Sequence, residues 1–95
     1  MTEIILQKSS NKDKKYDAFV DGKKVSFGQR GASDFTQHRD VERKQRYLDR
    51  HRKNENWNDL KTAGAWSRWL TWNKPTISAS IADMEKRFKV DIKRK

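Results

Sequence analysis

The dipeptide Asp21-Gly22 is the feature that most constrains the fold, because it separates two segments in which apolar and polar residues alternate. Asp-Gly between such segments favours a two-residue type I′ hairpin turn, since both central positions need a positive φ. This loop fixes the strand register and places Tyr16 opposite Phe27 at the far end of the hairpin. One face of the predicted hairpin then carries Tyr16, Ala18, Val20, Val25 and Phe27.

The other face of the predicted hairpin carries one aromatic residue, Phe19, among polar neighbours. Antiparallel sheets commonly bury one face and leave the other in water. Phe19 is therefore either covered by another element or presented to a partner, and we keep it as a candidate protein-interface residue.

Composition decides whether the rest of the chain folds around this hairpin. Only 33% of the 95 residues are hydrophobic, 38% are charged and the net charge is +10, which is a pattern that can indicate disorder. The 4 Trp, 4 Phe and 2 Tyr argue against disorder, because each buried ring removes roughly 150–250 Å² from water. We expect one small domain with a thin aromatic core, helped by a partner surface or by oligomerisation.

The apolar spacing after the hairpin predicts helices. Val41 to Lys53 has helical periodicity, with Val41 and Leu48 in one apolar seam, and Thr62 to Trp72 reads as a second short helix. A third stripe begins at Ile77, where Thr76 or Ser78 can cap the helix, and continues to Phe88. Residues 88–95 are compatible with a helix, with a free tail, or with a short strand beside Ile4–Leu6.

The expected fold class is therefore α+β. It is a small single domain with an N-terminal antiparallel β-hairpin, or three-stranded ribbon, followed by two or three short helices. Residues 1–95 form that domain, divided into an N-terminal strand and loop (1–14), the hairpin (15–28), a helical part (33–90) and a basic tail (91–95).

The excess positive charge is spread along the chain and suggests a polyanionic partner. Five cations on the predicted helix lie on one row, and the terminal residues form an uninterrupted basic run. Such a row of cations can lie along a phosphate backbone, although a charged face of a helix is often only solvated surface. The candidate polyanion-binding residues are Arg39, Arg43, Arg46, Arg50, Lys53, Lys93, Arg94 and Lys95.

Tryptophan and arginine are also the residues that dominate protein interfaces. Trp69 and Trp72 cannot both occupy the centre of one helix face, so at least one of the four Trp should be peripheral. We expect Trp66 and Trp69 in the core. The candidate protein-interface residues are Trp57, Arg68, Trp72 and Phe19.

No pattern predicts catalysis, a metal or a cofactor. The chain has no cysteine, and His38 and His51 are 13 residues apart, a spacing typical of no zinc site. The segment Gly28–Gly31 is too short for a phosphate-binding loop with its lysine. No stretch approaches the roughly 20 apolar residues of a membrane span, and the N-terminus lacks the pattern of a secretory signal. We therefore expect a non-enzymatic protein.

Several short motifs from the hairpin onward occur together in a fixed order. They are Val25-Ser26-Phe27-Gly28, Ser33-Asp34-Phe35-Thr36 with His38, Glu42-Arg43-Lys44-Gln45-Arg46-Tyr47, Arg50-His51, Asn54-Glu55-Asn56-Trp57, Thr62-Ala63-Gly64, Ser67-Arg68-Trp69-Leu70 and Trp72-Asn73-Lys74-Pro75-Thr76. The series, which covers roughly residues 15–82, resembles a family of small basic proteins encoded by giant viruses and other large double-stranded DNA viruses of eukaryotes.

The resemblance implies a context but no reaction, so no catalytic residues are carried over. It implies a viral protein, made in the cytoplasm or virus factory of an infected cell and packaged into the virion. The hypothesis from sequence is a minor capsid, cement or core-associated protein that bridges acidic surfaces of capsid protein or genome. The alternative is a free, sequence-independent nucleic-acid-binding protein.

Overall fold

The predicted hairpin is present, with the predicted register. Strands β2 (Lys14–Val20) and β3 (Lys23–Gln29) pair antiparallel, and Tyr16 lies opposite Phe27. Asp21 and Gly22 have φ values of 49° and 82°, as a turn with two left-handed central residues requires. This computed structural model describes residues 2–95 of the chain.

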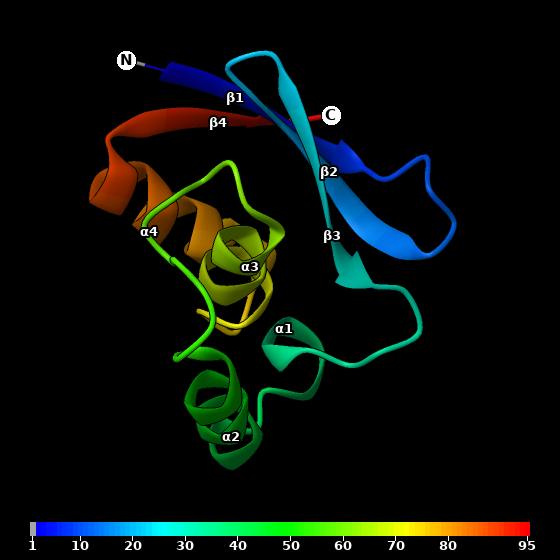
Figure 1. Cartoon of the computed structure of the whole chain (residues 1–95), viewed down its shortest axis with the longest axis vertical. Helices are drawn as coiled ribbons and strands as arrows, with labels where there is room; N and C mark the ends of the chain where they lie inside the picture. Colours follow the sequence, from blue (N-terminus) through cyan, green and yellow to red (C-terminus); the bar gives the residue numbers. More distant parts are fainter. Residues whose placement is uncertain (1) are drawn as a thin grey trace.

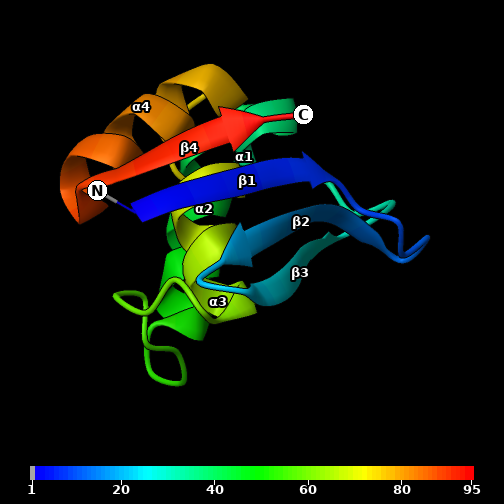
Figure 2. The same cartoon turned by 90° about the horizontal axis from the view of Figure 1, so that it is seen from above.

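Two further strands complete a mixed four-stranded sheet in the order β3-β2-β1-β4 (Figures 1 and 2). Strand β1 (Thr2–Lys8) pairs antiparallel with β2, and β4 (Val90–Arg94) pairs parallel with β1. Residues 91–94, which we assigned to a basic tail, are therefore part of the sheet. Of the alternatives for the C-terminal segment, the strand beside Ile4–Leu6 is the one that forms.

The helical part contains four α-helices and one π-helical turn. They are α1 (Phe35–His38), α2 (Val41–His51), α3 (Ala63–Trp66), the π-helix η1 (Ser67–Thr71) and α4 (Ile77–Phe88). Each α-helix begins after a residue whose side chain accepts a backbone N–H bond, as N-caps do. These caps are Asp34, Asp40, Thr62 and Thr76.

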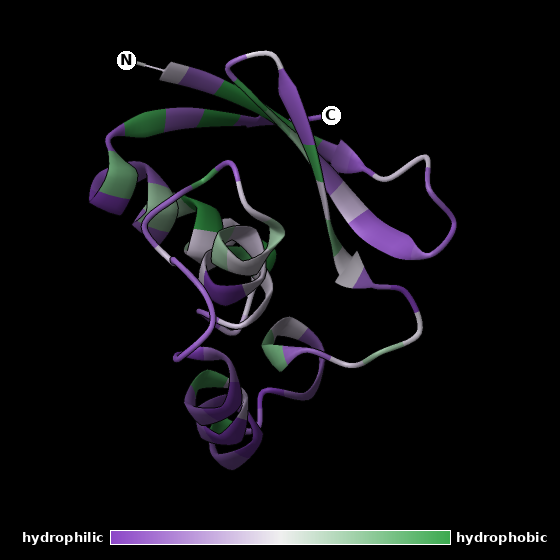
Figure 3. Cartoon of the chain, viewed as in Figure 1, coloured by the Kyte–Doolittle hydropathy of each residue, from purple (hydrophilic) through white to green (hydrophobic). Residues whose placement is uncertain are grey.

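The main core lies between one face of the sheet and the helices α3, η1 and α4 (Figure 1). Trp66, Leu70 and Met84 are fully buried there against the apolar side chains of all four strands. The expectation for Trp66 is confirmed, whereas Trp69 is only partly buried at the border of this core. Figure 3 shows hydrophobic colour on the strands and α4, and a largely hydrophilic α2.

The prediction that Val41 belongs to the buried apolar face of α2 is wrong. Val41 is 69% exposed, whereas Tyr47 and Leu48 are buried. The inward arc also contains Lys44, which lies 4.8 Å from the Phe35 ring centroid and donates a 2.7 Å bond to the Asn73 carbonyl. At about 100° per residue, that arc is centred roughly 70° from Val41, so the side chain of Val41 projects into solvent.

Candidate polyanion-binding surfaces

The cationic row predicted on α2 is shorter than expected. Arg43, Arg46 and Arg50 lie on the helix and are exposed. Arg39 precedes the helix in a left-handed conformation, and its Nε donates a 3.2 Å bond to the Pro75 carbonyl. Lys53 lies in the turn after the helix. We call Arg43, Arg46 and Arg50 the helix stripe.

The arginines of the helix stripe have no partner carboxylate within 4.0 Å among residues 2–95. The nearby acid Asp49 accepts a bond from Gln45 instead. Three guanidinium groups on a convex helix surface can each contact a phosphate or carboxylate without breaking an internal ion pair.

A second cationic surface, which the sequence did not reveal, lies at one end of the sheet. Strand register brings the end of β1, the start of β2 and the end of β4 together, since Lys8 pairs with Tyr16 and Leu6 with Arg94. The residue after β3, Arg30, joins them because its N–H donates to the Asp13 carbonyl. We call this set the sheet-end cluster: Lys8, Tyr16, Arg30, Arg94 and Lys95.

Two hollows flank Tyr16 in the sheet-end cluster. One has a volume of about 420 Å³ and the other of about 280 Å³. Tyr16 and Lys8 line both of them, so the two hollows share a wall. The remaining lining residues of the larger hollow are Lys15, Arg30, Gly31, Asp34, Thr36 and Gln37, and those of the smaller one are Leu6, Gln7, Arg94 and Lys95.

The acid that lines the larger hollow is already paired. Asp34 accepts a 2.6 Å bond from Lys15, and it also caps α1. Within the described chain, no side-chain carboxylate lies within 4.0 Å of Lys8, Arg30 or Arg94. Burial, followed by the charge of Asp34, raises the pKa of Tyr16, and Arg94 partly opposes this rise. The Tyr16 phenol is therefore a neutral hydroxyl donor at neutral pH.

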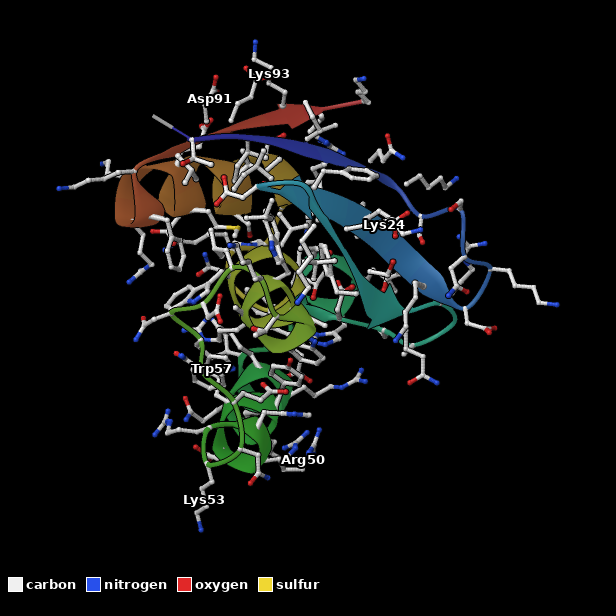
Figure 4. The ribbon with its side chains drawn as sticks, turned by 45° about the horizontal axis from the view of Figure 1, so that its top comes forward. Lys24, Arg50, Lys53, Trp57, Asp91 and Lys93 are labelled. Atoms are coloured by element: carbon white, nitrogen blue, oxygen red, sulfur yellow. The ribbon has the colours of Figure 1, made fainter. Side chains whose placement is uncertain are left out.

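The eight polyanion-binding residues expected from the sequence lie on different surfaces of the structure. Strand alternation separates Lys93 from Arg94, and Lys93 lies 3.6 Å from Glu3 in an exposed ion pair. Figure 4 shows Lys93 at the opposite end of the molecule from Arg50 and Lys53. The eight residues therefore form no single surface: Arg94 and Lys95 belong to the sheet-end cluster, and the helix stripe is separate.

Three of the candidate protein-interface residues have partners within the domain. The Trp57 indole donates a 2.8 Å bond to Glu55, and the Trp72 ring stacks on Tyr47 at 4.3 Å. The Arg68 guanidinium lies 4.1 Å from the Trp69 ring, and its pKa is lowered by burial and then by Arg87. All three side chains are half-buried, so their role at an interface stays a prediction.

Phe19, the fourth candidate, lies on the sheet face opposite the core. It is half-buried between Ile5 on β1 and Lys24 on β3. Of the four candidates it is the one that the fold leaves on an uncovered face of the sheet, and its contact with a partner stays a prediction.

The two histidines serve different elements of the fold. His38 Nδ1 accepts a 2.9 Å bond from the Asp40 N–H, whereas His51 Nδ1 lies 3.3 Å from Glu55. Among residues 2–95, no three His, Cys, Asp or Glu side chains are arranged to hold a metal ion. In the same part of the chain, no helix has the length and apolar character to cross a membrane.

These features define a small basic α+β domain with two separate cationic surfaces. Residues 4–51 match the model of a family of unknown function (DUF5754), and the chain belongs to that family. The matched region runs from β1 to α2 and contains Lys8, Arg30 and the helix stripe, whereas the tryptophan-rich segment and β4 lie outside it. No curated protein and no solved structure matches the chain.

Proposed function

We propose that this protein is a non-enzymatic structural protein that bridges two polyanionic surfaces. The observation that carries the proposal is the separation of its free cations into two groups, the helix stripe and the sheet-end cluster. Of the 23 Lys and Arg, only four lie within 4.0 Å of a carboxylate among the described residues. Some of the others, such as Lys44 and Arg68, are engaged within the domain, but the arginines of the helix stripe and Lys8, Arg30 and Arg94 have no partner carboxylate among the described residues.

Bridging requires that each surface act independently. Figure 1 shows α2, which carries the helix stripe, away from the strands that carry the sheet-end cluster, and electrostatic interactions are screened over about 8 Å at physiological salt. A polyanion bound at one surface therefore repels a second polyanion at the other only weakly. This geometry suits a protein held between two acidic surfaces better than one that lies along a single groove.

The resemblance to proteins of large DNA viruses supplies the context for this proposal. In a virus particle the acidic surfaces would be the packaged genome and the inner face of the capsid, which makes the protein a minor capsid, cement or core-associated component. The alternative is a free nucleic-acid-binding protein, for which both surfaces would bind nucleic acid. The particle component and the free nucleic-acid-binding protein would use the same cations, so the two hypotheses differ only in the identity of the second partner.

The first test measures duplex DNA binding by the intact protein as a function of salt. A duplex contact contributes about −0.9 to the slope of log K against log salt, so the variant R43Q/R46Q/R50Q should flatten the slope by about 2.7. The charge-matched variant K23Q/K24Q/K86Q, whose lysines lie outside both surfaces, should change the slope by less than one unit. Equal changes in both variants would show that the helix stripe makes no specific contact.

The second test asks whether one protein joins two polyanions. Beads that carry a duplex should capture a labelled second nucleic acid, either duplex or single-stranded, in the presence of the protein. The variant R43Q/R46Q/R50Q should abolish this capture while still binding the second nucleic acid. If the wild type binds the duplex but joins no second nucleic acid to it, the same assay is repeated with isolated capsid protein on the beads. Capture of neither partner would contradict the bridging proposal.

A further inference from the structure

We infer that the sheet-end cluster is a binding site for a single nucleic-acid strand, in which the hollows beside Tyr16 receive the phosphate groups of consecutive nucleotides. This inference rests on the proposed function, because it names the ligand of one of the two surfaces. It assigns a different form of nucleic acid to each surface, with a single strand at the sheet end.

The chemistry of the cluster indicates a phosphate ligand. Lys8, Arg30 and Arg94 bring three cations from three different strand ends to the two hollows, and no side-chain carboxylate of residues 2–95 neutralises them. Arginine binds phosphate oxygens in a bidentate manner, and lysine adds a point charge. Asp34 faces the larger hollow, but Lys15 at 2.6 Å compensates its charge.

The shape of the site favours a single strand over a duplex. The helix stripe lies on a convex surface, which can contact the phosphates of a rigid duplex, whereas the sheet-end cluster is concave. Hollows of about 420 and 280 Å³ are near the size of small-ligand pockets, and a duplex would have to bend its stiff backbone to place consecutive phosphates in both of them. A flexible strand can place consecutive phosphates on either side of Tyr16 at no such cost.

Tyr16 is held in position before any ligand arrives. Its ring stacks on Phe27 at 5.7 Å, and Phe27 stacks on the fully buried Trp66 at 5.5 Å. The Trp66 indole in turn donates a 2.7 Å bond to the Leu60 carbonyl. The aromatic wall between the hollows is thus anchored in the core, and preorganisation of this kind lowers the entropic cost of binding. Aromatic rings beside cationic grooves are typical of single-strand sites.

The test compares two charge-matched variants in binding to a fluorescent deoxythymidine oligonucleotide. K8Q/R30Q removes two cations from the sheet-end cluster, and K23Q/K24Q removes two exposed cations from the start of β3, at the opposite end of that strand from Arg30. We expect K8Q/R30Q to lose at least tenfold in affinity at 0.1 M salt and to flatten the salt slope by about 1.4, at about 0.7 per single-strand contact. K23Q/K24Q should lose less than threefold. Equal losses would overturn the site.

A second measurement keeps the inference testable if K8Q/R30Q does not fold. The same oligonucleotide is titrated into isotope-labelled wild-type protein, and backbone amide shifts are followed by NMR. Residues 6–8, 16, 30–31 and 94 should shift together, and shifts confined to α2 would overturn the inference. Duplex of the same length should leave the sheet-end amides unshifted, and a duplex that shifts them equally would contradict the preference for a single strand.

The source of the phosphate is distinguished by competition. Inorganic phosphate and thymidine monophosphate at millimolar concentration should displace less than half of the bound oligonucleotide, because each supplies only one phosphate group. Full displacement by either would identify a small-anion site instead. If the wild type binds neither single strand nor duplex at low salt, the proposed function fails as well. If it binds duplex but not the single strand, only this inference fails.

Discussion

The two parts of the molecule are held by different kinds of contact. The sheet packs on α3, η1 and α4 through a continuous apolar core, in which Trp66 and Met84 are fully buried. The α1–α2 pair lies outside that core and is attached by an aromatic stack and polar bonds. The helix stripe is thus carried by the less firmly attached part, whereas the sheet-end cluster is built on the strands.

This difference separates stability from one of the binding surfaces. Elements with few apolar contacts open locally at lower free energy than the core, so α2 should exchange its amide hydrogens faster than β1 or β2. Loss of the α1–α2 attachment should weaken duplex binding while leaving the sheet folded. The predictions below test this contrast, from the largest expected effect to the smallest.

The largest effect is expected for Trp66→Ala. The substitution removes a fully buried ring that joins Phe27 to the helical layer, and such truncations cost about 3–5 kcal/mol. Chemical denaturation followed by circular dichroism should show a loss of this size in the free energy of unfolding. A loss below about 1 kcal/mol would mean that the core does not depend on this ring.

Trp72→Ala should act mainly on the α1–α2 pair. The Trp72 ring is parallel to Tyr47, with a 1° angle between their planes, and lies 5.3 Å from His38. Its removal should cost about 2 kcal/mol, in keeping with a half-buried ring. Amide exchange should accelerate in α2 by at least tenfold, with β1 changed far less. Uniform acceleration in both elements would show that the molecule opens as one unit.

Asp34→Ala should have a smaller effect in the same direction. Its carboxylate caps α1 and pairs with Lys15, so the variant loses an N-cap and a largely buried ion pair. Caps are worth about 1 kcal/mol, and the stranded Lys15 adds a comparable cost. Asp34→Asn, which retains the cap but not the charge, separates the two contributions in thermal unfolding. Equal losses in the two variants would assign the effect to the ion pair alone.

The two parts should also respond to opposite extremes of pH. Burial and then the charge of Glu55 raise the pKa of Tyr47 from 10.0 to about 12. The stability that Tyr47 contributes as a neutral phenol is complete below pH 10 and is lost as the pH rises through about 12. Amide exchange in α2 should therefore accelerate in this alkaline window, and Tyr47→Phe should remove the dependence.

The corresponding group in the sheet is Asp17. Burial alone would raise its pKa, but hydrogen bonds from Ser26 and Ser9, at 2.6 and 2.7 Å, act together with the Ser10 N–H and the charge of Lys24 and lower the pKa from 3.8. The contribution of Asp17 is therefore present above pH 3.8 and is lost as the pH falls through its lower folded value. Acid unfolding monitored at β2 should shift to higher pH in Ser26→Ala, because one of these bonds is removed. An unchanged acid transition would contradict the assignment.

Local patterns were sufficient to predict the hairpin and the start of α4. Asp21-Gly22 set the register because the turn permits only one pairing, and Thr76 caps α4 because its short side chain reaches a free N–H group. Val41 was assigned to the wrong side of α2 because an aliphatic residue in the first turn carries little information about which arc of the helix is buried.

The sheet-end cluster could not be predicted, because its residues are scattered through the chain. Lys8 and Arg94 are brought together only by the parallel pairing of β1 with β4, and that pairing depends on five residues whose pattern also suits a helix. The period-two spacing of Phe88, Val90 and Ile92 was the one available signal. The sequence does predict Lys93, Arg94 and Lys95 as polyanion-binding candidates. That Lys93 and Arg94 lie on opposite faces of the sheet follows only once these residues are known to form a strand.

The parallel pairing of β1 with β4 has a consequence for synthesis of the protein on the ribosome. Strands β1, β2 and β3 emerge first, and β1 then has a bare hydrogen-bonding edge until residues 90–94 have been made. At about 5–20 residues per second, this delay lasts several seconds. An unpaired edge can recruit strands of neighbouring nascent chains. The two exposed lysines that begin β3 lie at the opposite edge of the sheet, where their positive charge opposes association of that edge with an identical chain.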